Sequence, residues 1–569
     1  MRDASVRVGP LVAAWLLSAC APKPLPNDPD AHVPLAATPQ WHNWSGDLVY
    51  TPVGEGENYY FSPTSRAELQ AILAKRPEGM KVRVSGQRHS QPPLVLEDNR
   101  TSEPEAATTW IIDLSCYADL GSSGEELFEL DAAQGKLTVN TGVREDHIDA
   151  YLTEHDLMLE TVTAGGFFSV GGMTAVDVHG ATIDAPIFAE TASAFTIMDA
   201  QGRVTTYDTD SAKIGAWSPL QFARVSLGAL GIVTSVTLDV KPRPYATTLV
   251  GGRSKYKLEN EAEFVAQYQQ LLAEHDRLES FWNPYSSEFL VLWWDIDEKP
   301  RKKRNQASAV ASSCTFAEHD LFGAPYEERG IEKFAEGTEH HVQLHGGADE
   351  ASLLIDTAMD VIEDQGRKAD KHHSDLWLLD AAQVIFMSYF VELPTTDVAG
   401  LSRVWQGLQA VKAADSSEFR LAGPLEFRFI RGGDSAMAGT YASSPNSLFV
   451  NLDLIGFVET MPASDYPPQM LEFFAKIERE WVGLGGWPHN GKMYGFYDPS
   501  AAAGTWTTPF NPNFLDALTE RRRDRVDAFE EFRRTRDPDQ VFCNAYLEGL
   551  SLCREVAPQV APAELVPLE

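Results

Sequence analysis

The chain has 569 residues and a mass of 62.8 kDa, long enough for two or more domains that each bury a core. Its 43% hydrophobic, 10% aromatic and 23% charged residues are typical of globular proteins and exclude a fibrous or disordered chain. Lys and Arg number 47 against 82 Asp and Glu, a net charge of −35, so the composition excludes nucleic acid as a broad partner.

The N-terminus predicts an exported protein. Two arginines and an apolar run over residues 8–17 form a signal sequence too short to span a bilayer as a helix. The sequence LSAC that ends at Cys20 resembles a bacterial lipobox, and the alternative is a plain secretory signal. Residues 1–20 are thus expected to be a lipoprotein signal and the Pro-rich residues 21–40 a tether. Membrane contact is expected only through lipid on Cys20, on the periplasmic or outer-membrane side.

The cysteines and histidines predict disulfides and no metal site. Besides Cys20 there are Cys116, Cys314, Cys543 and Cys553, and four thiols of an exported protein can pair in three ways. Cys543 and Cys553 are nearest in sequence, but spacing does not decide the pairing. No CxxC or HExxH motif occurs, and the adjacent histidines at 340–341 and 372–373 lack the i, i+4 spacing of a helical metal site.

The first half of the chain alternates short apolar runs with glycine-rich turns. The pattern predicts helices over residues 65–74, with Ser65 as N-cap, and over 144–155. Helices and strands interleave without a regular βαβ alternation, which favours an α+β domain over residues 41–245. The predicted strands cover residues 81–86, 136–142, 194–208 and 231–240.

From about residue 246 to 525, long amphipathic segments alternate with aromatic-rich apolar runs. This pattern predicts a second domain with an antiparallel sheet flanked by helices. A basic segment over residues 298–313 is interpreted as a solvated loop. The predicted helices are 259–274, 351–365, 398–413 and 467–481, and the predicted strands are 289–296, 383–393, 425–430 and 447–455.

Three glycine-containing segments of the first half indicate a ligand. VSGQRHSQPP at 84–93 directly follows a predicted strand, where Gly86 allows a tight turn and exposed amides can hold an anion. A second segment, 161–181, holds two glycine pairs and the dipeptide His179-Gly180, and a third is SLGALGIV at 226–233. Neither GxGxxG nor a P-loop motif is present, which excludes the usual Rossmann and P-loop folds.

In this order, the three segments resemble the FAD-binding domain of the vanillyl-alcohol oxidase and p-cresol methylhydroxylase (PCMH) family. The resemblance implies a two-subdomain PCMH-type FAD-binding domain. It also implies that His89 is joined covalently to the flavin, with an unattached loop histidine as the alternative. The cofactor-binding residues implied are Ser85, Gly86, Gln87, Arg88, His89, Ser90, Gly171, Gly172, His179, Gly180, Gly228, Gly231, Ile232 and Val233.

The second half supplies candidate catalytic side chains. GPLEFRF places Glu426 and Arg428 two residues apart on a strand, so both side chains lie on one face. In a pocket such a pair serves as an ionised base, or as an acid with a partner that orients a hydroxyl; on a surface it is a weak ion pair. Asn451 lies on the next predicted strand, and Lys492 lies with His489 in a glycine-bounded turn.

These segments resemble two groups of FAD-dependent alcohol oxidases. They are the aldonolactone oxidases and the covalent-flavin type II cholesterol oxidases, and the second resemblance covers most of residues 45–550. The closing segment, 526–555, resembles the stretch that returns to the flavin domain in this family. Ser287 stands where the cholesterol oxidases carry a gating acid, so Glu288, one residue later, is a candidate acid or a salt-bridging residue.

The resemblance implies the roles of the four other candidates. Glu426 would take the substrate proton or hold Arg428, which would orient the hydroxyl; Asn451 would bind the substrate oxygen, and Lys492 would steady the reduced flavin. We therefore expect an FAD-dependent oxidase that moves hydride from a secondary alcohol such as cholesterol to flavin, with O2 reduced to H2O2. Six aromatic residues suit a sterol cavity or belong to the core: Trp282, Tyr285, Trp293, Trp294, Phe386 and Tyr389.

Two alternatives stay open. One is an aldonolactone or sugar-alcohol oxidase, similar to D-arabinono-1,4-lactone oxidase, whose pocket would be small and rich in hydroxyl-binding groups. The other is a lipoprotein that keeps the flavin fold and only binds a ligand. Retention of Glu426, Arg428 and Lys492 argues against the second alternative.

Overall fold

The computed structural model describes residues 27–33, 40–51, 56–100, 107–243, 249–296, 330–369, 384–394, 398–442, 444 and 446–554. The predicted signal, Cys20, Cys314 and the basic segment lie outside these residues, and lipid attachment stays a prediction. Within the described ranges, no helix has the length and apolar character needed to cross a bilayer.

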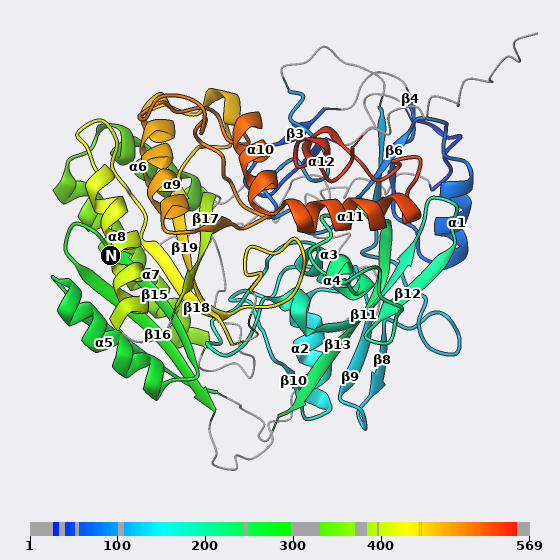
Figure 1. Cartoon of the computed structure of the whole chain (residues 1–569), viewed down its shortest axis with the longest axis horizontal. Helices are drawn as coiled ribbons and strands as arrows, with labels where there is room; N and C mark the ends of the chain where they lie inside the picture. The colour runs from blue at the N-terminus through cyan, green and yellow to red at the C-terminus, as the bar shows by residue number, and fades with distance from the viewer. Residues whose placement is uncertain are drawn as a thin grey trace, which may run out of the picture.

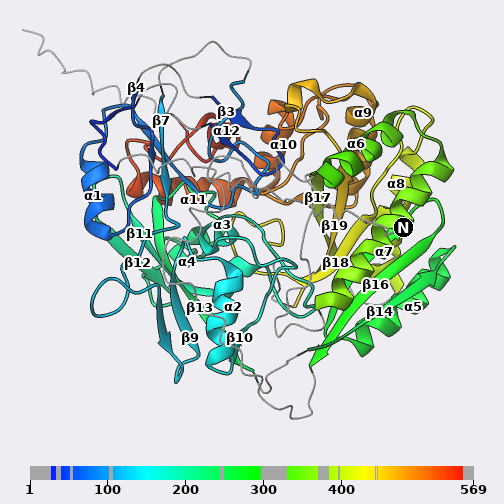
Figure 2. The same cartoon turned by 180° about the vertical axis from the view of Figure 1, so that it is seen from behind.

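The molecule has two lobes, with the first half of the chain and the C-terminal segment in one and most of the chain from Leu249 to helix α10 (Pro512–Arg521) in the other (Figures 1 and 2). The first lobe contains a small parallel sheet ordered β5-β7-β6, formed by Tyr60–Phe61, Thr109–Asp113 and Lys81–Ser85. Helix α1 (Arg66–Ala74) begins after Ser65, whose side chain accepts the N–H of Glu68. Two short pairs flank this sheet: β1 (His32–Val33) with β4 (Gly56–Glu57), and β2 (Trp41–His42) with β3 (Val49–Tyr50).

Part of the predicted tether is attached to the first lobe. β1 pairs with β4, and the Asn27 side chain donates to the carbonyl of Ser62 at 2.9 Å. The described residues 27–33 thus pack on the first lobe, and a tether over residues 21–40 stays a prediction.

A six-stranded antiparallel sheet completes the first lobe, in the order β12-β11-β13-β9-β8 with β10 beside β13. Its strands are β8 (Phe128–Asp131), β9 (Lys136–Asn140), β10 (Leu157–Leu159), β11 (Ala192–Met198), β12 (Val204–Asp208) and β13 (Ile232–Pro242). Its helices are α2 (Glu145–Glu154), α3 (Val170–Ala175), the 3-10 turn η2 (Phe188–Thr191) and α4 (Pro219–Ala223).

The second lobe is a seven-stranded antiparallel sheet ordered β14-β16-β15-β18-β19-β17-β20. Phe427 and Phe429 of β18 contact Tyr268 of α5, which covers one face of the sheet together with α8 and α9. The other face carries polar side chains on β18 and β19, and the apolar residues Phe281, Leu290 and Leu292 under α7. The strands are β14 (Leu249–Lys257), β15 (Arg277–Asn283), β16 (Glu288–Ile296), β17 (Ile385–Leu393), β18 (Leu425–Arg431), β19 (Leu448–Gly456) and β20 (Trp487–Pro488). The helices are α5 (Glu261–Glu274), α6 (Gly330–His345), α7 (Ala348–Ala369), α8 (Val398–Ala414), the 3-10 turn η4 (Ala463–Asp465) and α9 (Pro468–Gly483).

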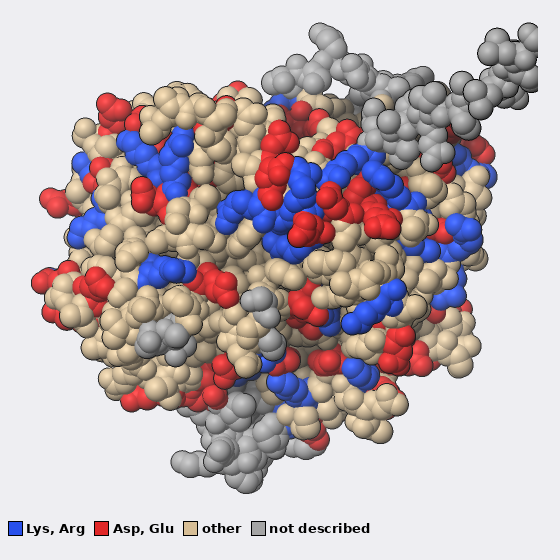
Figure 3. Space-filling model, viewed as in Figure 1, with Lys and Arg blue, Asp and Glu red and all other residues tan. Residues whose placement is uncertain are grey.

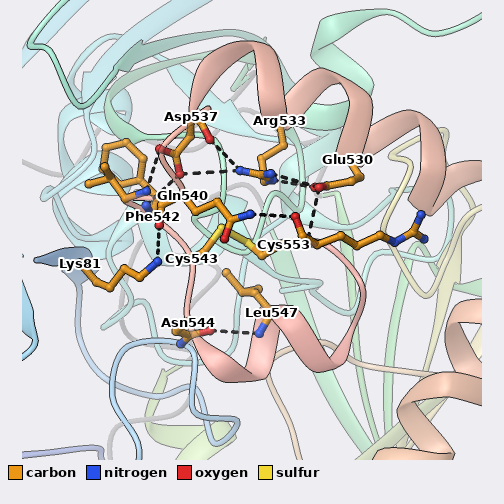
Figure 4. The surroundings of a disulfide bond; sticks show 12 residues. Lys81, Glu530, Arg533, Asp537, Gln540, Phe542, Cys543, Asn544, Leu547 and Cys553 are labelled. Carbon is orange, nitrogen blue, oxygen red and sulfur yellow. Dashed lines mark hydrogen bonds and ion pairs between the residues drawn. A yellow bond between two sulfur atoms is a disulfide. The ribbon is translucent and has the colours of Figure 1, made fainter. Parts of the chain in front are cut away.

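The C-terminal helices α10 (Pro512–Arg521) and α11 (Arg523–Arg536) run from the second lobe toward the first (Figure 1). After α11 the chain lies against β6, where the N–H of Val82 donates to the carbonyl of Val541 at 2.8 Å. Cys543 and Cys553 form a disulfide around α12 (Ala545–Gly549) (Figure 4). Cys116 is disulfide-bonded as well.

The predicted fold class, α+β, is confirmed: the structure combines mixed layers in the first lobe with a large antiparallel sheet in the second. Every predicted helix and strand named above has its counterpart, and the ends differ by a few residues. The densest basic band in Figure 3 lies over α11, but its arginines alternate with acids, as in the ion pair of Arg534 with Glu530 at 2.9 Å. This pairing leaves no uniformly positive surface on that face.

Candidate active site

A cavity of about 310 Å³ lies between the two lobes. The first lobe lines it with the loop after β6, the segment around α3 and the loop before β13. The second lobe contributes side chains from β17, β18, β19 and the turn after β20: Phe386, Glu426, Arg428, Asp453, His489, Gly491 and Lys492.

The loop after β6 presents backbone N–H groups to this cavity. Arg88 has φ +62, so the chain turns sharply there, and its carbonyl accepts the N–H of Trp44 at 2.8 Å. The N–H groups of Gln87, His89 and Ser90 meet no protein acceptor among the described residues. A Cβ on Gly86 would collide with the hydroxyl of Ser169. The loop therefore has the features of an anion-binding nest that requires glycine.

The segment around α3 brings backbone close to the cavity. Gly171 lies in the first turn of α3, and a Cβ there would be 3.0 Å from Cβ of Thr141. Gly172 and His179 also line the cavity, whereas Gly180 packs against the carbonyl of Val162 and does not. The helical form of this segment was not predicted, because six residues with two glycines give no helical periodicity.

In the loop before β13, Gly228 has φ +71 and Gly231 has φ +129, conformations that favour glycine. Gly228, Gly231 and Val233 line the cavity. Ile232, which lies between Gly231 and Val233 in the chain, is buried in β13 and does not line it. All the residues predicted to bind the cofactor except Gly180 and Ile232 thus line one cavity. Their individual roles stay predictions.

His89 lies among aromatic rings at the cavity wall. Its ring stacks on Trp44 with centroids 4.9 Å apart and on Phe167 at 5.3 Å. Burial lowers the pKa of His89 to about 3, helped by the charges of Lys492, Arg88 and Arg144. The imidazole is therefore neutral and retains a lone pair at physiological pH.

The strand register gathers the polar groups on one face of the large sheet. Arg428 of β18 stands opposite Glu279 of β15 and Asn451 of β19, and Glu426 stands opposite Asp453. Directly opposite residues of an antiparallel sheet share a face, so all five side chains lie on the same side. That side is the one from which Glu426, Arg428 and Asp453 reach the cavity.

Arg428 is the centre of an ion cluster. Its guanidinium pairs with Glu279 at 2.7 Å and with Glu426. Burial alone would lower the pKa of Arg428, but the carboxylates of Glu279, Glu426 and Asp453 outweigh it and raise that pKa above its usual value. Arg428 is thus a permanent cation at the cavity wall.

Asn451 contacts the cavity wall only indirectly, through other side chains. Its Nδ2 donates to the hydroxyl of Ser388 at 2.9 Å, and that hydroxyl is bonded to Asp453. Oδ1 of Asp453 has no hydrogen-bond partner among the described residues. Asn451 itself does not line the cavity, and its expected contact with substrate stays a prediction; in the structure it bonds to Ser388, which bonds to Asp453.

Asp177 fixes the turn that carries Lys492. Its carboxylate accepts the N–H of Gly439 at 2.8 Å and both the N–H and Nδ2 of Asn490, at 2.8 and 2.6 Å. Nζ of Lys492 lies 3.9 Å from the ring centroid of Phe386. Burial lowers the pKa of Lys492, and the nearby charges of Asp453 and Glu426 oppose this effect.

Glu288 lies away from this site. It begins β16, is about one-third exposed, and pairs with Lys255 at 3.7 Å. It does not line the cavity, so the salt-bridging alternative matches its position. The residue one place earlier, Ser287, has φ +59, so the strand begins only after this turn.

Of the six aromatic residues proposed for a sterol cavity, only Phe386 lines the cavity. Trp282 is buried in the core against Phe289, and the hydroxyl of Tyr389 donates to Glu478. For the other five, the core alternative is the one that matches the described structure.

Sequence reasoning missed several site residues. Asp453 follows Asn451 by two residues in LFVNLDL, so the strand alternation that selected Glu426 and Arg428 would have selected it too. Glu279 lies on β15, a strand that the sequence analysis did not predict. Other missed cavity residues from the first lobe include Arg83, Asp113, Ser115, Thr141 and Thr163.

The first-lobe residues fit a dinucleotide. The unpaired amides of the loop suit phosphate oxygens, and the glycines leave room for close backbone approach; on the second-lobe side, the unpartnered Oδ1 of Asp453 is available as an acceptor. Residues 58–208 match the family model for an FAD binding domain, and residues 395–550 match the model for D-arabinono-1,4-lactone oxidase. The chain belongs to the FAD-binding, PCMH-type oxidase family.

Individual relatives are distant. The chain is 25% identical to L-gulonolactone oxidase of Mus musculus over 262 residues, which are 46% of this chain and 52% of the mouse protein. The match therefore spans about half the length of that relative. The chain is 21% identical to the mitochondrial L-galactono-1,4-lactone dehydrogenase 2 of Oryza sativa subsp. japonica, over 76% of this chain and 73% of the rice protein.

The crystal structure of cholesterol oxidase from B. sterolicum has the same fold. It superimposes with a TM-score of 0.66 at 17% identity, over 93% of this chain and 98% of that chain.

Proposed function

We propose that the protein oxidises a CH–OH group of its substrate with FAD bound in the cavity and O2 as the electron acceptor. The observation that carries the proposal is the ion cluster of Arg428, Glu426 and Glu279, which faces the same cavity as the FAD-binding loops. Bound FAD supplies the hydride acceptor for such a reaction.

Arg428, Glu426 and Glu279 have different roles in this reaction. Carbon-bound hydrogen leaves as hydride most readily when negative charge develops on the hydroxyl oxygen. Arg428, a permanent cation, stabilises that charge, and Glu426 accepts the hydroxyl proton. Glu279, 1% exposed, is a positioning residue that holds Arg428 from the neighbouring strand.

We further propose a polyhydroxylated substrate, such as an aldonolactone or a sugar alcohol, in place of a sterol. On the second-lobe side, the described cavity wall carries two carboxylates, a guanidinium and an ammonium, and its aromatic side chains are Phe386 and His489. Buried charges require polar partners, which a hydroxyl-rich substrate offers and a sterol ring system does not. The curated relatives bear the names of lactone oxidases and dehydrogenases.

Anaerobic mixing with candidate substrates tests this function. L-gulono-1,4-lactone, D-arabinono-1,4-lactone or a sugar alcohol should bleach the flavin absorbance, because the charged wall can bind their hydroxyls. Cholesterol in detergent micelles should leave the absorbance unchanged. Faster bleaching by cholesterol would refute the substrate proposal, and no bleaching by any alcohol would favour a binding protein.

Substitution of the ion cluster should slow the chemical step. Glu426→Gln removes the proton acceptor and Arg428→Ala removes the cation, so each should slow anaerobic flavin reduction by about 100-fold or more. Stopped-flow absorbance at saturating substrate measures this rate. Arg431→Ala, on the same strand but outside the cavity, is the matched control. Near-normal rates in both cluster variants would remove these residues from the mechanism.

Asp453 should give the reaction a pH dependence. Burial raises the pKa of Asp453 to about 6, with a further contribution from Glu426. Since the ionised carboxylate accepts a substrate hydroxyl, kcat/KM should rise as pH increases through about 6 and then level off. Asp453→Asn should remove that rise and lower kcat/KM by about 10-fold. An unchanged pH profile in Asp453→Asn would contradict this role.

We also propose that FAD is attached covalently through His89. The neutral imidazole, exposed in part to the cavity, would bond through a ring nitrogen to a methyl carbon of the flavin, with loss of one methyl proton and of the imidazole N–H proton and with the two electrons passed to O2. Acid-precipitated holoprotein should keep its yellow colour, and His89→Ala should lose it to the supernatant. His155→Ala, at an exposed histidine, is the control. Colour released from wild-type protein by acid would show that the cofactor is bound without a covalent link.

A further inference from the structure

Arg83 is a buried cation at the wall of the cavity. The residue is 4% exposed and lies at the centre of β6, two residues before the strand ends. The loop that follows β6 is the one whose backbone N–H groups face the cavity. Its Nε donates to the carbonyl of Leu94 at 2.7 Å and its Nη2 to that of Leu227 at 2.7 Å. Its Nη1 donates to the carbonyls of Gly228, at 3.1 Å, and Phe542. All its described partners are therefore neutral carbonyl groups.

Some other buried arginines have carboxylate partners. Arg428 pairs with Glu279 and Arg533 pairs with Glu530, at 2.7 and 2.6 Å. Arg522 and Arg525 instead donate to the carbonyls of Met437 and Ala436, but unlike Arg83 they do not line the cavity. No ion pair of Arg83 occurs among the described residues; the side chain senses Asp537 only through a longer-range charge effect. Burial lowers the pKa of Arg83 to about 10, which still leaves it charged. A buried charge without a counterion is costly, so an anion in the adjacent cavity would stabilise it.

The same hydrogen bonds orient the loop before β13. In a trans peptide the C=O and the following N–H point in opposite directions. When Leu227 turns its carbonyl to Arg83, the N–H of Gly228 therefore points to the other side. A Cβ on Gly228 would lie 3.1 Å from Nη2 of Arg83, so the glycine also permits this close packing.

The segment after α11 also binds Arg83, through the carbonyl of Phe542. Beside the bond to Phe542, Nζ of Lys81 donates to the carbonyl of Gln540 at 2.7 Å. The Asn544 side chain donates to the carbonyl of Pro93 at 2.8 Å. We call residues 537–554 the C-terminal loop. The Cys543–Cys553 disulfide closes it, and Asp537 accepts the N–H groups of Val541 and Phe542.

We propose that Arg83 is the counterion of the FAD diphosphate, and that the disulfide-closed C-terminal loop keeps it at the cavity wall. Arg83 acts through its charge and through the loops whose carbonyls it holds. The inference rests on the FAD-binding domain and is independent of the substrate, so its failure and that of the proposed reaction are separable.

A probe that carries the diphosphate without the flavin tests this role. ADP and adenosine differ only in the diphosphate, and neither can attach to His89. Apoprotein from riboflavin-starved cells is titrated with each ligand, and thermal denaturation is followed. Arg83→Met should raise the Kd of ADP by about 30-fold or more and leave the effect of adenosine unchanged. Arg83→Lys, which keeps the charge and loses most carbonyl bonds, should fall between Arg83→Met and wild type.

The matched control is Lys81→Met, which loses a bond to the same C-terminal loop at a residue that does not line the cavity. It should bind ADP within about 3-fold of wild type. Equal loss of ADP and adenosine binding in Arg83→Met would show that Arg83 has only a structural role, and this result would overturn the proposal. If Arg83→Met does not fold, Arg83→Lys decides: ADP binding weakened by less than about 30-fold with an unchanged response to adenosine supports the charge role, and a response lost equally for both ligands overturns it.

The disulfide part of the proposal has its own test. A Cys543→Ala, Cys553→Ala double variant should fold, bind ADP about 10-fold more weakly and respond to adenosine as wild type does. Wild-type ADP binding in the double variant would remove the disulfide from the proposal.

Discussion

Asp177 joins the two lobes at the point where the cavity is formed. It leaves the first lobe just after α3 and accepts three N–H groups from the second lobe, on Gly439 and Asn490. Asn490 lies between His489 and Lys492, so this one carboxylate sets the position of both side chains relative to the FAD-binding loops. Burial raises the pKa of Asp177 to about 6, and the N–H donors of Asn490 and Gly439 oppose this effect by stabilising the carboxylate.

The large sheet imposes a second constraint through its register. An antiparallel sheet repeats every two residues, and here three adjacent strands place acids and bases opposite one another. The same strands bury Phe427, Phe429 and Leu452 on the other face, under α5, α8 and α9. A shift of one residue would therefore move the ion cluster into the core and aromatic rings into the cavity. The register that buries the core also determines the chemistry of the cavity.

The sequence predicted the elements and the loop positions well because these depend on local signals. Alternation located β18 and β19, and the cap at Ser65 located α1. It did not reveal contacts that depend on register or on distant pairing. Glu279 reaches Arg428 from a separate strand, and Asn451 reaches Asp453 only through Ser388 on β17. Glu288 shows the same limit: the turn at Ser287 sets where β16 begins, and no periodicity within the strand indicates that the acid pairs with Lys255.

The two ends of the cavity differ in how their charged groups are paired, and this difference matches the ligand proposed for each end. At the β6 end a cation, Arg83, has carbonyl partners alone and the loop amides are unpaired, so that end attracts a multiply charged anion. At the sheet end, Arg428 is already paired with Glu279 and Glu426, and Asp453 retains an unpartnered oxygen. Because the charges at the sheet end are largely compensated within the protein, this end has little attraction for a second anion. Its polar groups can instead form hydrogen bonds with a neutral ligand that has many hydroxyls. Under the proposed function, the β6 end would hold the diphosphate and the sheet end a polyol, and the neutral imidazoles of His89 and His179 line the same cavity.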